Sequence, residues 1–288
     1  MKSNHAHHSK GQTATLEAPL DVLPEVPPEV PPEGALRVPL DALSDAPPAP
    51  PVVIRRLRGK ERRLYDAQGF VVVPNVFPPA ELDAMDHEID RLLAEPGNDA
   101  GGIHPTWVFQ LARKSDLARA FAEDARLLTL IEDVVKPGIA IHSSKLVPKP
   151  PHSEDVCHWH QDDAFYIKPD DPATFSTTRM SVWVPLQDSD ERNGCLWVVP
   201  GSQTWGLQDF HMVETGQCRK VIDREAYANE HAIPLPVKAG SVVLFSALLW
   251  HHSKNNRTDR VRRAFIVSYQ EATVGRGAGE QWKILRPA

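Results

Sequence analysis

The 288-residue sequence predicts a mainly β protein with flanking α-helices, arranged as a double-stranded β-helix, or jelly roll. Two observations predict this fold. Helical periodicity is confined to the first half of the folded region, and from Ile139 onward short β-type runs are broken by Pro, Gly and Asn. Helices that precede many short strands are typical of one β-rich domain backed by helices.

Residues 1–51 differ from the rest of the chain. They contain 11 of the 27 prolines, in runs such as Pro27-Pro28, and no aromatic residue. Proline removes backbone donors and favours extended polyproline II geometry. We therefore expect a disordered N-terminal tail over residues 1–51 and one folded domain over residues 52–288, which is long enough for a large core.

Two stretches have helical spacing of apolar residues. The first begins after Pro78-Pro79, which suits a helix start, and carries Leu82, Met85, Ile89 and Leu92. The second covers residues 115–135 and ends at Pro137-Gly138. Both stretches are predicted to be amphipathic helices.

Four later runs have strand character: residues 181–186, 196–199, 240–245 and 262–269. Asn193-Gly194, a strong tight-turn signal, precedes the second run. Residues 96–106 and 203–235 are predicted to be long loops or lids. Long loops in compact domains are often functional, so we expect substrate selection to depend on these two segments.

Composition argues against several classes of protein. The net charge of -6 and the pI of about 6.1 give no basic field for nucleic acid. The sequence has no apolar run of transmembrane length and no secretory signal, so we expect a cytoplasmic protein that does not bind membranes. We also expect a monomer or a homodimer. The three cysteines, Cys157, Cys195 and Cys218, lack Cys-x-x-Cys spacing, and reduced thiols are the simplest expectation.

His160-Gln161-Asp162 places an imidazole and a carboxylate two residues apart. On an extended segment these side chains point to the same side, since strands have a side-chain period of two. His251 comes from a distant strand and completes a 2-His-1-carboxylate set. This set suits non-haem Fe(II) and leaves coordination positions open. A lone His-x-Asp is weak evidence in a chain with 13 histidines, so its context matters.

The surrounding segments resemble the phytanoyl-CoA dioxygenase family of Fe(II)/2-oxoglutarate oxygenases over about residues 68–270. The resemblance rests on residues 69–74, 158–162, 193–202 and 251–256. It implies a jelly-roll, cupin-like domain that uses Fe(II), 2-oxoglutarate and O2, with His160, Asp162 and His251 as iron ligands. It also implies that Arg262 pairs with the far carboxylate of 2-oxoglutarate, that Ser253 donates to that carboxylate, and that Trp183 packs against the cosubstrate.

The chain departs from the family pattern at two positions. Gln203 stands where many relatives have a histidine that is not an iron ligand, so iron binding is unaffected. His252 stands where many relatives have glycine, which leaves open which neighbouring imidazole binds iron. We favour His251 because its offsets to Ser253, Asn256 and Arg262 match the family.

The resemblance implies hydroxylation of an aliphatic C–H bond of a small molecule, such as a secondary-metabolite intermediate, with release of succinate and CO2. The same cofactors also serve desaturation, cyclisation and epoxidation. Halogenation is disfavoured because Asp162 fills the position that family halogenases leave to halide. Two other classes are a non-catalytic metal-binding sensor and a zinc hydrolase, in which Arg262 has no purpose.

Overall fold

The structure, a computed structural model, describes residues 54–95, 107–168, 170–275 and 283–288. All of the described residues belong to one compact unit. The predicted tail, residues 1–51, and the predicted loop at residues 96–106 lie outside the described residues.

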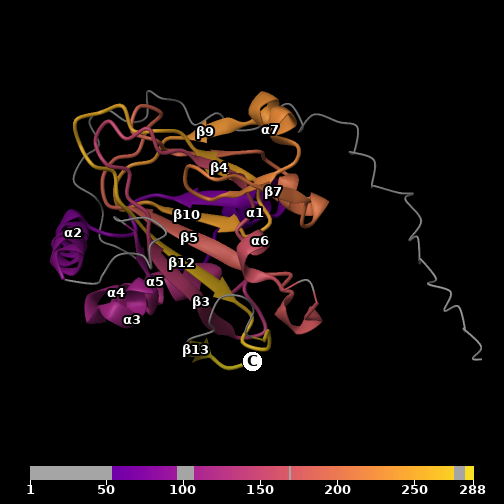
Figure 1. Cartoon of the computed structure of the whole chain (residues 1–288). Coiled ribbons are helices and arrows are strands. Elements are labelled where there is room, and N and C mark those ends of the chain that lie inside the picture. Colours follow the sequence, from indigo (N-terminus) through magenta and orange to yellow (C-terminus); the bar gives the residue numbers. More distant parts are fainter. Residues whose placement is uncertain (1–53, 96–106, 169, 276–282) are drawn as a thin grey trace, which may run out of the picture. The chain divides into compact units, whose positions relative to one another are not determined.

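The strands form two antiparallel sheets and one ribbon (Figure 1). The seven-stranded sheet has the order β1 (Phe70–Val73), β10 (Val242–Ser246), β5 (Met180–Pro185), β12 (Ala264–Gln270), β3 (Ile139–Leu146) and β13 (Lys283–Arg286), and β2 (Val108–Phe109) also pairs with β3. The four-stranded sheet has the order β4 (Cys157–His160), β11 (His251–Ser253), β6 (Leu196–Val198) and β9 (Ile233–Leu235). The ribbon joins β7 (Phe210–Met212) to β8 (Lys220–Ile222). The predicted jelly roll is confirmed.

Helices occupy the first half of the domain and a few connections. They are α1 (Gly59–Gln68), α2 (Pro79–Ala94), α3 (Leu111–Lys114), α4 (Asp116–Ala122), α5 (Ala125–Ile131), α6 (Asp163–Tyr166) and α7 (Glu225–His231), with 3-10 turns η2 (Pro172–Thr174) and η3 (Ser202–Trp205). None of the helices in the described residues is long and apolar enough to cross a membrane.

The large sheet separates two apolar clusters. On β5, Val182 and Val184 belong to a cluster with the helices, whereas Trp183 belongs to a second cluster with Leu196 and Val198 of the small sheet. This alternation follows from the period of two along a strand. The second cluster therefore fills the space between the two sheets.

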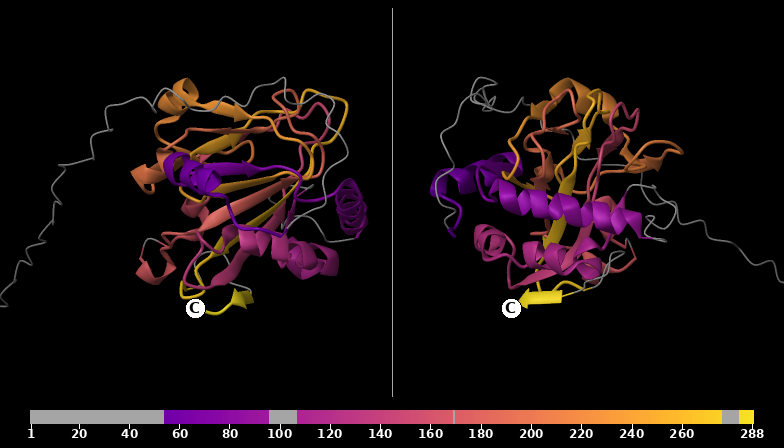
Figure 2. Two further views of the ribbon diagram at one scale, coloured as in Figure 1. Left: turned by 180° about the vertical axis from the view of Figure 1, so that it is seen from behind. Right: turned by 90° about the vertical axis from the view of Figure 1, so that its left-hand side faces the viewer.

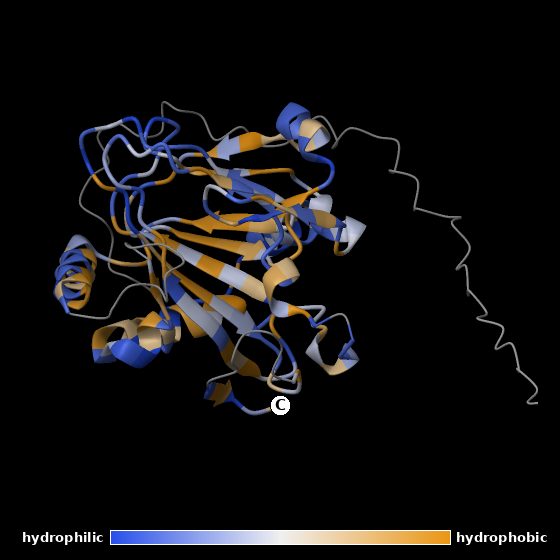
Figure 3. Ribbon diagram, in the orientation of Figure 1, coloured by the Kyte–Doolittle hydropathy of each residue, from blue (hydrophilic) through white to orange (hydrophobic). Residues whose placement is uncertain are grey.

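The helix predicted from Leu82, Met85, Ile89 and Leu92 is confirmed as α2, and all four side chains are buried. A backbone N–H in the first turn of a helix has no partner within the helix. Proline, which has no backbone N–H, therefore fits there at no cost. Figure 3 shows apolar and polar residues interspersed along α2, as expected for a helix with one buried side. Figure 2 shows α2 beside the shorter helices of the same half.

The single helix predicted over residues 115–135 is wrong in one respect, because the structure has two helices there. The side chain of Asp124 accepts a hydrogen bond from the backbone of Arg126 and begins α5. Helix α1 was not predicted, because Tyr65 is its one buried residue and its apolar periodicity is weak.

The predicted loop over residues 203–235 is also corrected, since it contains η3, β7, β8, α7 and β9. Part of it packs on the outer face of the small sheet, where Ile222 and Ala228 join a cluster with Trp159 and Trp250. The pattern was missed because these elements have three to seven residues each, too few to establish a periodicity.

Candidate metal centre

His160, Asp162 and His251 lie together between the two sheets. One ligand atom from each falls within 4.8 Å of the others, and all three residues are buried. His160 ends β4, and His251 begins β11 directly opposite it in the antiparallel register. Strand pairing therefore brings the two imidazoles together, with ring centroids 4.1 Å apart.

Asp162 reaches this cluster by a different route from the predicted one. The strand ends at His160, and the backbone of Asp162 has helical angles (φ -59°, ψ -37°) at the start of α6. The expectation that one strand presents both ligands is therefore wrong. A tight turn brings the Asp162 carboxylate to 3.9 Å from His160 Nε2 instead.

Both histidines are fixed in orientation by backbone carbonyls. His160 Nδ1 lies 2.7 Å from the oxygen of His158, and His251 Nδ1 lies 2.8 Å from the oxygen of Leu249. Each Nδ1–H thus donates, which leaves the Nε2 lone pair for a metal. Burial lowers the pKa of both imidazoles, so they are neutral, as a metal ligand must be.

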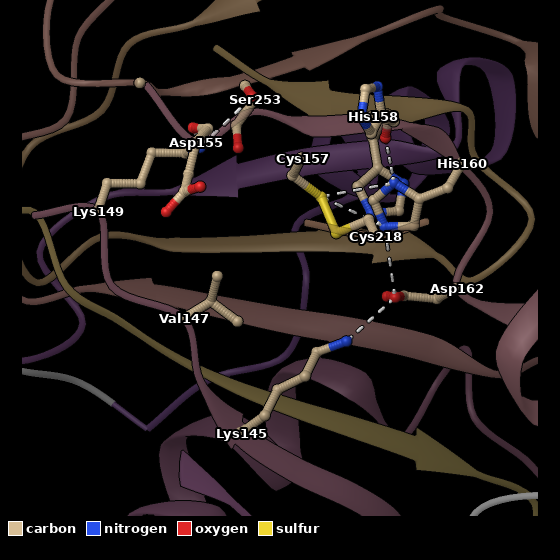
Figure 4. Close-up of a disulfide and its surroundings, with 12 residues drawn as sticks. Lys145, Val147, Lys149, Asp155, Cys157, His158, His160, Asp162, Cys218 and Ser253 are labelled. Carbon is tan, nitrogen blue, oxygen red and sulfur yellow. Dashed lines mark hydrogen bonds and ion pairs between the residues drawn. A yellow bond between two sulfur atoms is a disulfide. The ribbon is translucent and has the colours of Figure 1, made fainter. Parts of the chain in front are cut away.

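Asp162 is held as an anion by groups that the sequence motif did not reveal. Burial alone would raise its pKa, but the Lys145 ammonium and the hydrogen bond from Ser181 lower the pKa below its usual value. Lys145 Nζ lies 3.2 Å from Asp162 Oδ1 (Figure 4), and Ser181 donates a hydrogen bond to Oδ2. Neither residue belongs to a motif; each arrives from a strand of the large sheet.

The structure brings His251, and not His252, to the cluster. The His252 ring stacks on Trp159 with centroids 4.0 Å apart, and it also lies near Trp197. Neighbours on a strand point to opposite faces, so only one of the two can meet His160. The preference for His251 agrees with this geometry.

Arg262 lies buried just before β12 with no carboxylate partner in the part of the chain that the structure describes. Its guanidinium donates to the carbonyl oxygens of Val147 and Gly194, at 3.3 and 2.8 Å, but its buried Nε has no hydrogen-bond partner. Burial lowers its pKa to about 10. An unpaired cation with a free donor fits the carboxylate of 2-oxoglutarate.

Ser253 and Trp183, the other predicted cosubstrate residues, are also buried. Ser253 lies on β11 two residues after His251, hence on the same face. Trp183 faces Arg262, with its ring centroid 5.6 Å from the guanidinium carbon. Arg262, Ser253 and Trp183 thus share one region of the interior.

A cavity of about 570 Å³ opens beside His160 and Asp162. Aromatic and apolar side chains form much of its wall, with cations among them: Trp107, Phe109, Phe165, Tyr166, Met212, Lys145, Arg219 and Lys220. Arg262, Ser253 and Trp183 are not in this wall. The cavity therefore lies on one side of the cluster, and the three predicted cosubstrate residues lie elsewhere in the interior.

Two residues near the motif prove to be structural. Asp163, next to the motif, is buried and its carboxylate forms an ion pair with Arg179. Gln203 packs against Gly69 and donates to the carbonyl of Asp66 at 3.3 Å, beside α1. Neither lines the cavity.

The expectation of three reduced cysteines is wrong. Cys157 and Cys218 form a disulfide, and Cys195 is free and buried. The two partners are 61 residues apart in the chain and come together only because β4 packs beside the segment before β8. Sequence spacing gave no signal for this pair.

Comparisons with known proteins agree with the geometry. A family model, phytanoyl-CoA dioxygenase (PhyH), matches residues 65–264. The ectoine dioxygenase of Sphingopyxis alaskensis is 28% identical over 232 residues, which is 73% of this chain and 75% of that protein. Phytanoyl-CoA dioxygenase domain-containing protein 1 of Mus musculus is 28% identical over 170 residues, 57% of this chain and 54% of that protein, so the chain spans about half of it.

Among solved structures, EctD from S. alaskensis with bound Fe superimposes with a TM-score of 0.66 at 24% identity. The match covers 81% of this chain and 87% of that one. At this identity the likeness shows the shared fold.

Proposed function

This chain belongs to the phytanoyl-CoA dioxygenase family, and we propose that it hydroxylates an aliphatic C–H bond of a small molecule. It is a 2-oxoglutarate-dependent non-haem iron dioxygenase that uses Fe(II), 2-oxoglutarate and O2. The proposal rests on one observation: His160 and Asp162 border a largely apolar cavity of about 570 Å³, next to the third ligand His251. A cavity of this size suits a small organic substrate.

In this proposal Nε2 of His160, Nε2 of His251 and a carboxylate oxygen of Asp162 would hold the iron. When bound, iron and 2-oxoglutarate would supply the oxidising power to insert one oxygen atom of O2 into a C–H bond. The protein's own groups orient the ligands: the carbonyls of His158 and Leu249 fix the imidazoles, and Ser181 fixes the carboxylate.

Arg262 is proposed to hold the far carboxylate of 2-oxoglutarate through its free Nε–H, with Ser253 as a second donor and Trp183 beside it. Phe165 and the other aromatic side chains of the cavity wall would shield the reacting carbon from water. Desaturation, cyclisation and epoxidation need the same residues and cofactors. Desaturation and cyclisation remove two hydrogen atoms, so product mass separates them from hydroxylation. Epoxidation adds one oxygen atom, as hydroxylation does, and NMR of the product separates these two.

The first test is Asp162→Ala. Loss of a ligand and a negative charge should abolish stoichiometric iron binding and succinate release from 2-oxoglutarate, with or without substrate. Glu154→Ala, in an exposed loop and outside the cavity wall, is the matched control. Full activity in Asp162→Ala without added halide would contradict the proposed triad.

A sensor on the same fold differs in outcome, because it would bind iron and 2-oxoglutarate without releasing succinate. A zinc hydrolase would leave 2-oxoglutarate unbound, so the buried Arg262 favours the dioxygenase over it. The cytoplasmic location, the absence of nucleic-acid binding and the monomeric or dimeric state stay predictions. The disulfide weighs against a strongly reducing compartment.

A further inference from the structure

The Cys157–Cys218 disulfide touches the proposed iron ligand His160 (Figure 4). Cys157 Sγ lies 3.7 Å from Nδ1 and 3.9 Å from Nε2 of the His160 ring. Cys157 precedes His160 on β4 by three residues, and Cys218 lies in the cavity wall. The sulfur pair and the iron site therefore share one imidazole.

Cys157, Cys218 and His160 also form a donor set of their own. One ligand atom from each lies within 4.8 Å of the others, the same limit that the iron triad meets. Two thiolates and an imidazole are typical ligands of zinc, with the fourth position open. We propose that reduction of this disulfide creates a Zn²⁺ site from Cys157, Cys218 and His160, which competes with iron for His160.

The backbone keeps the two cysteines together after reduction. Gln217 N donates to the carbonyl of Val156 at 2.7 Å, and His158 N donates to the carbonyl of Gln217 at 3.1 Å. Two thiolates on one zinc lie about 3.8 Å apart, given Zn–S bonds of about 2.3 Å and tetrahedral angles. Side-chain rotation can supply this separation while the hydrogen-bonded backbones stay in place.

The chemistry of reduction balances with an external dithiol. The dithiol gives two electrons to the S–S bond and becomes a disulfide, and the two cysteine sulfurs become thiols. Zinc binding then displaces their protons. Zinc binds to such sites more tightly than Fe(II), and thiolates increase the preference.

Only one metal at a time can use His160. Its Nδ1–H donates to the carbonyl of His158, so Nε2 carries the single available lone pair. In the intact disulfide neither sulfur is a thiolate. The site then offers only nitrogen and oxygen ligands, which suit iron. The competition rests on the proposed role of His160, whereas the thiolate site itself does not.

The test uses Co²⁺ as a spectroscopic substitute for zinc on the full chain. The oxidised sample is prepared with oxidised glutathione. It is accepted when a thiol assay in denaturant finds one free thiol per chain. The reduced arm is prepared with dithiothreitol, which is then removed without oxygen. The reduced wild type should show a near-ultraviolet thiolate-to-cobalt band that the oxidised protein lacks.

Cys157→Ser and Cys218→Ser should lose this band, and Cys195→Ser should keep it. Loss of a group that only orients a metal ligand lowers metal affinity by up to roughly 100-fold. Loss of a ligand itself should cost at least as much, so we expect zinc affinity in Cys157→Ser and Cys218→Ser to fall by at least roughly 100-fold. Stoichiometric Fe(II) binding by Cys218→Ser shows that the variant is folded. A reduced wild type without the band, or a band that survives in Cys157→Ser, overturns the thiolate site.

Metal analysis after adding Zn²⁺ to the iron-loaded protein tests the shared ligand separately. Zinc should displace iron from the reduced chain and not from the oxidised chain. If the cobalt band appears but iron stays bound beside zinc, His160 is not shared. That result would overturn the competition, because His160 would then bind only one of the two metals, and it would leave the two-thiolate site standing.

Discussion

Arg262 and Arg263 are neighbours in the sequence with opposite surroundings. Arg262 is buried beside Trp183 with an unpartnered Nε. Arg263 points the other way and forms ion pairs with Asp86 and Asp90 on α2, at 3.0 and 2.6 Å. Extended backbone places adjacent side chains on opposite faces, so each arginine meets a different part of the molecule.

Arg262→Ala should weaken 2-oxoglutarate binding and spare iron binding. Removing one partner of a buried charge pair costs roughly 2–5 kcal/mol. Since about 1.4 kcal/mol is tenfold in affinity, the dissociation constant should rise roughly 30-fold or more. Titration of the iron–2-oxoglutarate charge-transfer band measures it. Arg263→Ala is the matched control, and a larger effect in that variant would contradict the role of Arg262.

His251→Ala should lose iron, whereas His252→Gly should keep it. His251 meets His160 across the strand pair, and His252 stacks on Trp159 outside the cluster. Metal analysis of the two purified variants decides between them. The reverse pattern would move the ligand by one residue and put Ser253 and Arg262 out of register.

His252 should also make stability depend on pH. Burial, with the nearby charge of Lys254, lowers its pKa to about 3 from an unfolded value near 6.5. The folded state therefore resists protonation. Above about pH 6.5 His252 is neutral in both the folded and the unfolded state, and its contribution to stability is complete. As pH falls from about 6.5 towards 3, only the unfolded state takes up the proton, so the free energy of unfolding falls by up to about 1.4 kcal/mol per pH unit.

His252→Phe keeps an aromatic ring against Trp159 and removes the titration. Urea unfolding of iron-free protein at about pH 7 and about pH 5 should therefore show a smaller loss of stability in the variant than in the wild type. Parallel losses in both proteins would show that His252 does not titrate as described.

At the scale of elements, Asp124 separates α4 from α5. Its side chain accepts from the backbone N–H of Arg126 at 2.8 Å and pairs with the Arg126 guanidinium, which also reaches Glu81. Apolar spacing runs on through this point, so periodicity alone predicted one helix. Capping is a local hydrogen bond, and it outweighs the continuity of the pattern.

Asp124→Ala should therefore reduce the free energy of unfolding by about 0.5–2 kcal/mol, the usual range for loss of an N-cap. Asp124→Asn retains a capping oxygen and should lose less. Urea denaturation of the three proteins gives the order. Equal stabilities of wild type and Asp124→Ala would mean that the cap contributes nothing.

At the scale of the whole molecule, Leu57 is the first residue of the chain that belongs to an apolar cluster of the described residues. These clusters pack the helices and the two sheets together. The proline-rich tail lies outside the described residues, and its predicted independence stays a prediction. Deleting residues 2–48 should leave the melting temperature and turnover nearly unchanged, because such a segment buries little surface. A large fall in either would show that the tail packs on the domain.

The sequence by itself determined the local features of this protein. The apolar spacing predicted α2, and the β-branched runs predicted β5 and β12. The preference for His251 over His252 came from the resemblance, because the offsets within 251–262 match the family. Such patterns recur within a single helix or strand, so they can be recognised without knowing which element packs against it. The resemblance to a family supplied the reaction class.

Only the tertiary structure decided which distant groups surround the proposed iron ligands. Pairing of β4 with β11 brings His251 to His160, and a turn, not a strand, brings Asp162. Lys145 reaches Asp162 from β3, and the packing of β4 joins Cys157 to Cys218 across 61 residues. These contacts depend on register between segments far apart in the chain, which no local pattern records, because a sequence period reports the face of an element and not its neighbour.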